Sequence, residues 1–245
     1  MEQAGQPAVP EPGSRPPPAP LILYSFYRSS CAWRVRNALE LKGVKYEYRA
    51  VNIFEKEQKT EDFVRLNTLQ QVPVLVVNDG RTIGESVAIL EYLEEVYPEP
   101  RLLPSSPYDR AIVRQLVEII NSGTQPLQNL RVLLRVGELG GDAERTKWAR
   151  DAIVRGLGGF EDIIRRTAGI YCYGDQITWA DAVLVPQVFN ARLYGVNLDV
   201  FPTIQRVEAA LLEHPAFMKA HAGNQPDTPP KNSADAGQKL SGEIR

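Results

Sequence analysis

The stretch "LILYSFYRSSCAWRVRNALELKG" (residues 21–43) decides the fold, because it joins a short apolar run to a segment with helical periodicity. The run at 21–26 predicts a strand, and the apolar spacing that follows predicts a helix over 30–43, ended by a glycine. Arg36 and Glu40 stand four residues apart and predict an ion pair on the polar face of this helix.

The segments that follow continue this first unit. A strand, a short helix, two further strands and a second long helix are predicted, in that order, at 45–53, 60–66, 74–77, 81–83 and 85–97. The last two strands are joined by a tight Asn-Asp-Gly turn, so they must be antiparallel. The sequence therefore predicts an α/β half of the form βαβ, then α, then ββα.

A cluster of prolines separates this half from the rest of the chain. Four prolines lie within 97–107, where they are incompatible with a continuing helix. Helical periodicity dominates beyond them, with helices predicted at 107–136, 143–167, 178–194 and 202–213. We expect the chain to be organised as follows: a disordered proline-rich arm (1–20), an α/β domain (21–98), a linker (99–106), an all-helical domain (107–221) and a mostly disordered tail (222–245).

Composition narrows the classes of function. The chain has 245 residues, 43% of them hydrophobic, which is enough for a packed core, and its net charge of -2 leaves no electrostatic footprint for nucleic acid or an anionic membrane. Its two cysteines, without a C-x-x-C spacing, support neither a disulfide framework nor a structural zinc site. No secretory signal or membrane-spanning run is apparent. We expect a cytoplasmic protein that takes small molecules, with no metal, membrane or nucleic-acid partner.

The junction between the first strand and the first helix carries the first chemical signal. Ser29, Ser30 and Cys31 stand where open amide groups and the helix dipole stabilise an anion, and a hydroxyl there can lower the pKa of a bound thiol. A serine at this point is equally an ordinary helix cap. Cys31 is a rival nucleophile, because Arg28 and Arg34 flank it, although no resolving cysteine follows.

Two further features of the α/β half complement this junction. Val72-Pro73 opens a strand with a proline, which predicts a turn or a cis bond that leaves the Val72 main chain free to pair with an extended peptide. Glu85-Ser86 begins the next helix and offers amides to a carboxylate and an acid to an ammonium group. Together they predict a cleft for a short peptide with a thiol and a free α-amino acid end.

The segment "ITWAD" (177–181) predicts another helix start, by a different device. Thr178 and Asp181 have the spacing of a capping box, in which each side chain bonds the other residue's amide. We interpret this box as a folding signal.

Several motifs resemble the zeta class of glutathione transferases, whose members are maleylacetoacetate isomerases. The matching stretches are "SSCAWRVRNAL" (29–39), "QVPVL", "ESVAILEYLEE", "QPLQNLRVL" (125–133) and "QPDTP" (225–229), within a resemblance that runs from residue 21 to 229. The resemblance implies a thioredoxin-like domain that binds glutathione, an all-helical domain that takes an acidic substrate, and a homodimer.

The resemblance also implies roles for individual residues. Ser29 would hydrogen-bond the glutathione thiolate, with Ser30 and Cys31 assisting. The other glutathione contacts would be Ala32, Trp33, Arg34, Gln58, Val72, Glu85, Ser86, Gln125, Asn129, Leu130 and Arg131.

The substrate side of the site departs from the family pattern. Some relatives carry an arginine for the substrate carboxylate at the position of Leu193, whereas here the arginine comes one residue earlier, at Arg192. That shift turns the side chain about 100° around a helix. Arg28, Arg131 and Arg192 are the candidates to stabilise negative charge on the substrate, with Arg28 and Arg192 taken as substrate contacts.

The activity implied by the resemblance is glutathione-dependent conversion of maleylacetoacetate to fumarylacetoacetate, in phenylalanine and tyrosine catabolism, by reversible addition of the thiolate. Three alternatives remain open on the residues alone. These are a general transferase that conjugates electrophiles or dehalogenates α-halo acids, a thiol oxidoreductase that uses Cys31, and a non-enzymatic binding module.

Overall fold

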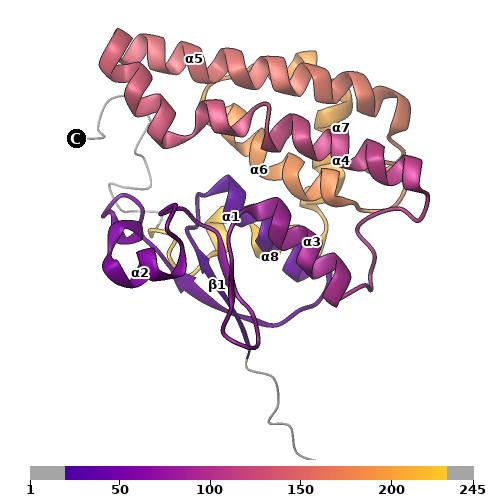
Figure 1. Ribbon diagram of the computed structural model, residues 1–245. Helices are drawn as coiled ribbons and strands as arrows, with labels where there is room; N and C mark the ends of the chain where they lie inside the picture. Colours follow the sequence, from indigo (N-terminus) through magenta and orange to yellow (C-terminus); the bar gives the residue numbers. More distant parts are fainter. Residues whose placement is uncertain (1–19, 231–245) are drawn as a thin grey trace, which may run out of the picture.

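The structure is a computed structural model that describes residues 20–230. The proline-rich arm through residue 19, and the part of the tail at 231–245, lie outside the described residues. Figure 1 shows two parts, a sheet with its helices below and a layer of longer helices above. This arrangement confirms the predicted fold class, an α/β thioredoxin-like half followed by an all-helical half.

A four-stranded mixed sheet forms the centre of the α/β half. Its strands are β1 (Leu21–Ser25), β2 (Tyr46–Ala50), β3 (Val74–Val76) and β4 (Thr82–Ile83), in the order β2-β1-β3-β4. The pair β1–β2 is parallel, whereas β1–β3 and β3–β4 are antiparallel. Because β1 is central, its carboxyl end and the loop that follows lie in the middle of the sheet edge.

Three helices flank the sheet: α1 (Ser30–Leu41), α2 (Glu61–Leu66) and α3 (Ser86–Val96). Helix α1 ends just before Gly43, whose φ of +63° favours glycine. The predicted Arg36–Glu40 ion pair is wrong, because Arg36 is 0% exposed and points inward while Glu40 pairs with Lys219 at 2.7 Å. Helix α1 packs against α3, α6 and α8 and so keeps no solvent face for Arg36.

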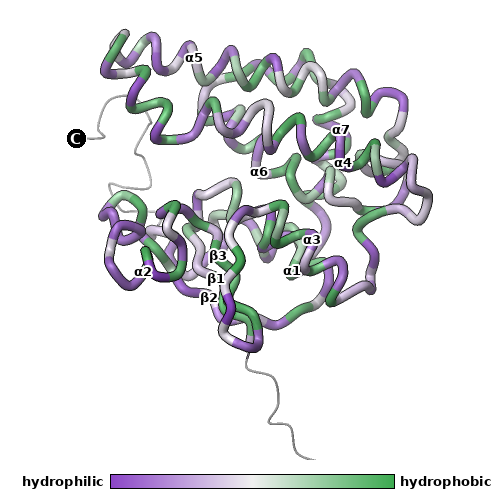
Figure 2. The backbone as a smooth tube through the Cα atoms, viewed as in Figure 1, coloured by the Kyte–Doolittle hydropathy of each residue, from purple (hydrophilic) through white to green (hydrophobic). Residues whose placement is uncertain are grey.

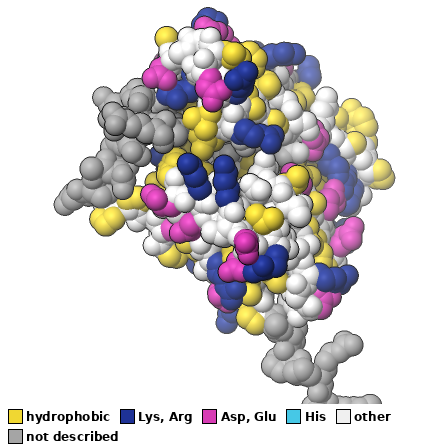
Figure 3. Space-filling view, turned by 60° about the vertical axis from the view of Figure 1, so that its left-hand side comes forward, with side chains coloured by type: hydrophobic (Ala, Val, Ile, Leu, Met, Phe, Trp, Pro, Cys, Tyr) yellow, Lys and Arg dark blue, Asp and Glu magenta, His cyan; other side chains and the backbone are white. Residues whose placement is uncertain are grey.

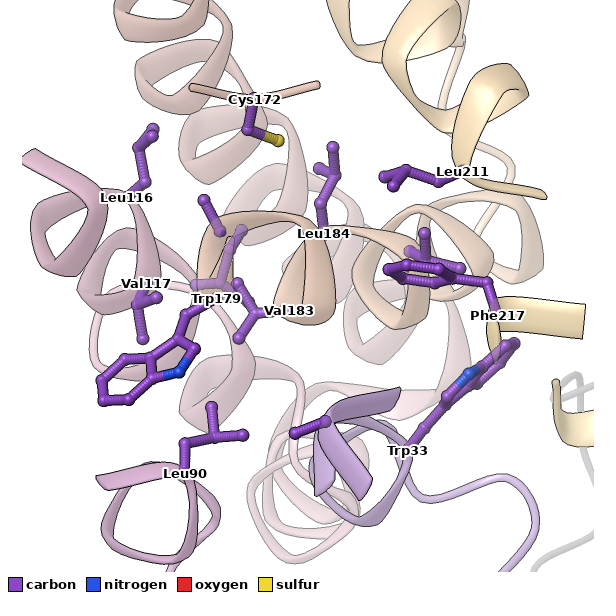
Figure 4. Packing of buried hydrophobic residues seen from close by; sticks show 14 of the residues in the cluster. Trp33, Leu90, Leu116, Val117, Cys172, Trp179, Val183, Leu184, Leu211 and Phe217 are labelled. Atoms are coloured by element: carbon purple, nitrogen blue, oxygen red, sulfur yellow. The ribbon is translucent and has the colours of Figure 1, made fainter. Parts of the chain in front are cut away.

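The upper layer consists of α4 (Pro107–Asn121), α5 (Leu130–Thr167), α6 (Trp179–Leu193) and α7 (Pro202–Leu212). The short helix α8 (Pro215–Ala220) follows them and packs against α1 in the lower part. In Figure 2, α5 alternates between hydrophilic and hydrophobic residues, as expected for a helix with one buried face. Buried residues of both halves form one hydrophobic cluster, in which Trp179 of α6 lies near Leu90 of α3 (Figure 4). The two halves therefore share one core.

The helical half breaks at a different place from the one predicted. A single helix over 107–136 is wrong, because the chain leaves the helix after Asn121. The Thr124 hydroxyl donates to the Ile119 carbonyl at 2.7 Å, and a short 3-10 helix follows at Gln125–Gln128, with Pro126, which lacks an N–H, in its first turn. The break between helices predicted at 136–143 is instead a kink within α5 at Gly141, whose φ is +81°.

The chain returns to the α/β half at its end. The segment 222–230, expected to belong to a mostly disordered tail, begins with a 3-10 turn at Ala222–Asn224. The Gln225 side chain then donates to the carbonyls of Lys219 and His221, each at 2.9 Å. This ordered segment lies beside the first two strands through hydrogen bonds to Asp227.

The surface carries both signs of charge. On the face shown in Figure 3, Lys and Arg side chains are interspersed with Asp and Glu side chains. Between residues 20 and 230, none of the helices combines the length and the hydropathy that a membrane span requires.

Candidate functional site

The start of α1 forms the corner of the candidate site. Ser29 closes a turn, its amide donating to the Phe26 carbonyl at 3.0 Å, and its Oγ caps α1 by accepting the Ala32 amide at 3.2 Å. A hydroxyl that accepts one hydrogen bond still has its own proton to donate. The amides of Ser30 and Cys31 have no hydrogen-bond acceptor within the described part of the chain. The cap hypothesis is confirmed, and the cap leaves three donors open at a partly exposed helix start.

Ala32 and Trp33 do not belong to this corner. Ala32 is 0% and Trp33 is 1% exposed, and their amides both donate to Ser29. The Trp33 ring packs edge-on against the rings of Phe189 and His221, with centroids 5.3 and 4.9 Å apart. Both side chains are buried in the core, as Figure 4 shows for Trp33, so they offer no open group at this corner, and their contact with glutathione stays a prediction.

Arg34 connects the corner to the next helix start. It is 1% exposed, and its Nη1 donates to Ser86 Oγ at 3.1 Å and to Asn121 Oδ1 at 2.8 Å. Its Nε and Nη2 have no partner among residues 20–230. One guanidinium thus joins α1, α3 and α4. No signal in the sequence singles out Asn121, since its part depends on how α4 packs on α1.

The start of α3 is a second open helix terminus. No side chain caps it, and its N-cap residue, Glu85, has φ +61° and ψ 116°, a conformation that only glycine adopts readily. Such strained residues concentrate at functional sites. Glu85 is exposed while Ser86 is buried beneath it, so this terminus presents amides together with one carboxylate.

Val72 lies between the two helix starts. The register of β1 with β3 pairs Tyr24 with Val74, and continuing it by two residues places Val72 opposite Phe26. The Val72–Pro73 bond is cis, one of the two alternatives predicted. The Val72 amide and carbonyl make no hydrogen bond to any residue that the structure describes. An unpaired stretch of main chain thus lies beside the serine turn.

The remaining predicted contacts lie on two other segments. Gln58 donates to the Ile53 carbonyl at 3.4 Å, and its buried Oε1 has no partner among the described residues. The α4–α5 junction begins at Asn121, next to Arg34, and carries the half-buried Gln125 and the α5 cap Asn129, which accepts the amide of residue 131. Leu130 is half-buried and Arg131 is exposed at the start of α5.

The cations predicted for the substrate side differ in their surroundings. The guanidinium of Arg28 lies 5.9 Å from the centre of the Phe54 ring. Burial raises the pKa of the Tyr194 hydroxyl, and the positive charges of Arg28 and Arg145 oppose the shift, which places both cations near this ring.

Arg192 has another partner. Its predicted contact with substrate stays a prediction, but in this structure it forms a bidentate ion pair with Glu208 of α7, with both contacts at 2.5 Å. The physical reason is the position one residue before Leu193, which turns the side chain toward α7.

Two family models match the chain, one to each half. The model described as glutathione S-transferase, N-terminal domain, matches residues 19–95, and the model described as glutathione S-transferase, C-terminal domain, matches residues 108–223.

Named relatives match over nearly their whole length. The maleylacetoacetate isomerase of Rattus norvegicus is 50% identical over 85% of this chain and 95% of that protein, and that of Dictyostelium discoideum is 44% identical over 86% and 97%. A crystal structure of maleylacetoacetate isomerase from Anaeromyxobacter dehalogenans with glutathione in its active site is 48% identical, with a TM-score of 0.80, over 86% of this chain and 98% of that one. A bacterial maleyl pyruvate isomerase of the zeta class is 38% identical, with a TM-score of 0.82, over 85% and 100%.

Proposed function

This chain belongs to the glutathione S-transferase family and, within it, to the zeta class of maleylacetoacetate isomerases, and we propose that it converts maleylacetoacetate to fumarylacetoacetate with glutathione as its cofactor. The observation that carries the proposal is the start of α1, where the hydroxyl of the capping serine and two amides are left open on consecutive residues. Such donors hold a sulfur anion near neutral pH.

Glutathione fits the groups that are left unpaired. Its peptide can pair with the Val72 main chain, and its α-amino acid end can meet the uncapped start of α3, with the carboxylate on the amides and the ammonium on Glu85. Arg34 holds the Ser86 hydroxyl in place from below. When bound, glutathione supplies a thiolate that adds reversibly to the cis double bond of the substrate and so permits rotation.

Different residues of the protein then stabilise the thiolate and bind the substrate. Ser29 donates a hydrogen bond from its hydroxyl to the sulfur, with the Ser30 and Cys31 amides adding to the positive end of the α1 dipole. Arg28, the residue before Ser29, would balance a substrate carboxylate, and Arg131 is the second cation available to the substrate. Preorganised donors of this kind lower the barrier without reorganising during the reaction.

We assign glutathione binding to the domain at 21–98 and substrate binding to the domain at 107–221, joined by the linker at 99–106. Membership of the zeta class also supports a homodimer in the cytoplasm. Light scattering of the purified protein and fractionation of cells expressing it would test these two points.

The test of the function uses maleylacetone, a stable substrate of the same chemistry. We expect trans product to form only with glutathione present, and the glutathione concentration to be unchanged at the end. Chlorodinitrobenzene is the comparison electrophile, and we expect it to be conjugated far more slowly. Consumption of glutathione without isomerisation would instead identify a general transferase.

A further inference from the structure

The turn that carries Ser29 is anchored from the inside by Arg36. This guanidinium donates to the Phe26 carbonyl at 3.2 Å and to the Tyr27 carbonyl at 2.9 Å. Its Nη1 also donates to Ser25 Oγ at 3.0 Å, at the end of β1. The inner side of the turn is therefore bonded to a side chain that is 0% exposed.

The outer side of the same turn is anchored by the C-terminal segment. The Tyr27 amide donates to Asp227 Oδ2 at 2.9 Å, and the Tyr48 hydroxyl donates to the other carboxylate oxygen at 2.6 Å. The yellow end of the chain lies beside the indigo first strands in Figure 1. Residue 27 thus has its carbonyl held by Arg36 and its amide held by Asp227.

Asp227 also provides a negative charge close to the guanidinium of Arg36. Burial lowers the pKa of Arg36 to about 10, and the charge of Asp227 acts in the opposite direction, which places it within electrostatic reach of the guanidinium. Arg36 in turn donates to the Ala220 carbonyl at 3.1 Å, where α8 ends and the C-terminal segment begins. The segment is therefore tied to the turn by a hydrogen bond and by a charge, and these two ties can be separated by mutation.

We propose that Asp227 is a positioning residue for the thiolate corner: it fixes the Tyr27 peptide and thereby the placement of the Ser29 hydroxyl two residues later. The inference rests on the proposed function, because it supposes that Ser29 meets the sulfur of glutathione. A displacement of about 1 Å in such a group can cost on the order of 100-fold in rate. Asp227 itself acts through the turn and touches neither glutathione nor substrate.

The test compares Asp227→Ala with Asp227→Asn. The readout is the fraction of enzyme-bound glutathione present as thiolate at neutral pH, measured by its ultraviolet absorbance, together with kcat and Tm. We expect Asp227→Ala to raise the pKa of the bound thiol by about one unit, which is a tenfold change in the ratio of thiolate to thiol, and to lower the thiolate fraction and kcat by up to about tenfold. We expect Asp227→Asn to keep the thiolate, because the amide oxygen still accepts from Tyr27, but to show a lower Tm, because the counter-charge of Arg36 is gone.

A matched control separates positioning from stability. Val207 is fully buried in α7, away from the turn, so Val207→Ala lowers Tm without changing any contact of Tyr27. We expect its thiolate fraction to equal that of the wild type. If Asp227→Ala fails to fold, Tyr48→Phe removes one of the two bonds to the carboxylate and should lower the thiolate fraction by a smaller factor.

Two results would overturn the inference alone. The first is a wild-type thiolate fraction in Asp227→Ala or, if that variant does not fold, in Tyr48→Phe. The second is a loss of thiolate in Val207→Ala equal to that in Asp227→Ala. Absence of bound thiolate in the wild type would instead overturn the proposed function, so the two failures are distinguishable.

Discussion

Helices α1 and α6 start in the same way and differ in what they leave open. Each has a hydroxyl residue at its N-cap, Ser29 in α1 and Thr178 in α6. In α6 the predicted capping box is present, and Asp181 accepts from the Thr178 amide at 2.7 Å and from its hydroxyl at 3.0 Å. Helix α1 has no acidic residue in its first turn, and its first two amides are left without an acceptor among the described residues.

The difference shows that a hydroxyl at a helix start does not by itself distinguish folding from function. Asp181 is 0% exposed and also accepts the Cys172 amide at 2.8 Å, so α6 has its own anion built in. Burial raises the pKa of Asp181, while these hydrogen bonds oppose the shift. Helix α1 keeps the same dipole but has no internal anion, and it can therefore bind one from outside.

The largest effect is expected from opening the closed helix start. Asp181→Ala leaves two amides and one hydroxyl buried without an acceptor, so we expect the free energy of unfolding to fall by about 3–5 kcal/mol. Urea denaturation measures the loss. Thr178→Ala is the matched variant, and it should cost about 1 kcal/mol, since the carboxylate remains. Equal losses in the two variants would contradict this account of α6.

At the open start of α1, we expect a substitution to lower activity strongly and stability only slightly, the reverse of α6. We expect Ser29→Ala to lower kcat for maleylacetone on the order of 100-fold at saturating glutathione, as for loss of one preorganised donor, but to lower stability by only about 1 kcal/mol. Ser106, which caps α4 by accepting the Asp109 amide, provides the control. Ser106→Ala should cost similar stability and no activity. Unchanged turnover in Ser29→Ala would show that the hydroxyl does not hold the sulfur.

The start of α3 sharpens the comparison, because its opening is accompanied by backbone strain. Replacing Glu85 by glycine relieves its φ of +61°, so we expect Glu85→Gly to be more stable by about 1 kcal/mol. The same change removes the carboxylate, and KM for glutathione should rise about tenfold, as for loss of one charged hydrogen bond. Glu85→Gln retains the strain and should raise KM without a gain in stability. Thermal unfolding and steady-state kinetics measure the two effects separately.

The smallest effect concerns the inner face of α1, where Trp33 packs against His221. Burial, and then the charge of Arg36, lower the pKa of His221, so the folded protein holds this ring neutral. An unfolded histidine takes up a proton near pH 6.5, and stability is therefore lost as the pH falls below about 6.5 toward the lower pKa of the folded state.

Protonation also removes the acceptor for the Gly223 amide, now 3.0 Å from His221 Nδ1. We expect Tm of His221→Asn to fall less than that of the wild type between pH 7 and 5.5, because the amide oxygen accepts from Gly223 at every pH. Parallel Tm profiles would contradict a neutral His221.

Much of the fold follows from local pattern. The order of strands and helices, the start of α1 at Ser29 and the capping box at Thr178 were predictable, because hydrophobic spacing and hydroxyl caps act over a few residues. The break after Asn121 was missed although Gly123 and Pro126 mark it, since a strong helical periodicity on both sides obscured these signals.

The sequence by itself determined that a serine begins the first helix, that a proline opens the third strand, and which family these motifs resemble. Only the tertiary structure decided which groups support them. Arg36 turned inward because α1 packs against α3, α6 and α8, Arg192 paired with Glu208 of α7, and Asp227 reached an amide 200 residues away. Such contacts are set by how helices pack, and a shift of one residue redirects a side chain by about 100°, which local pattern does not encode.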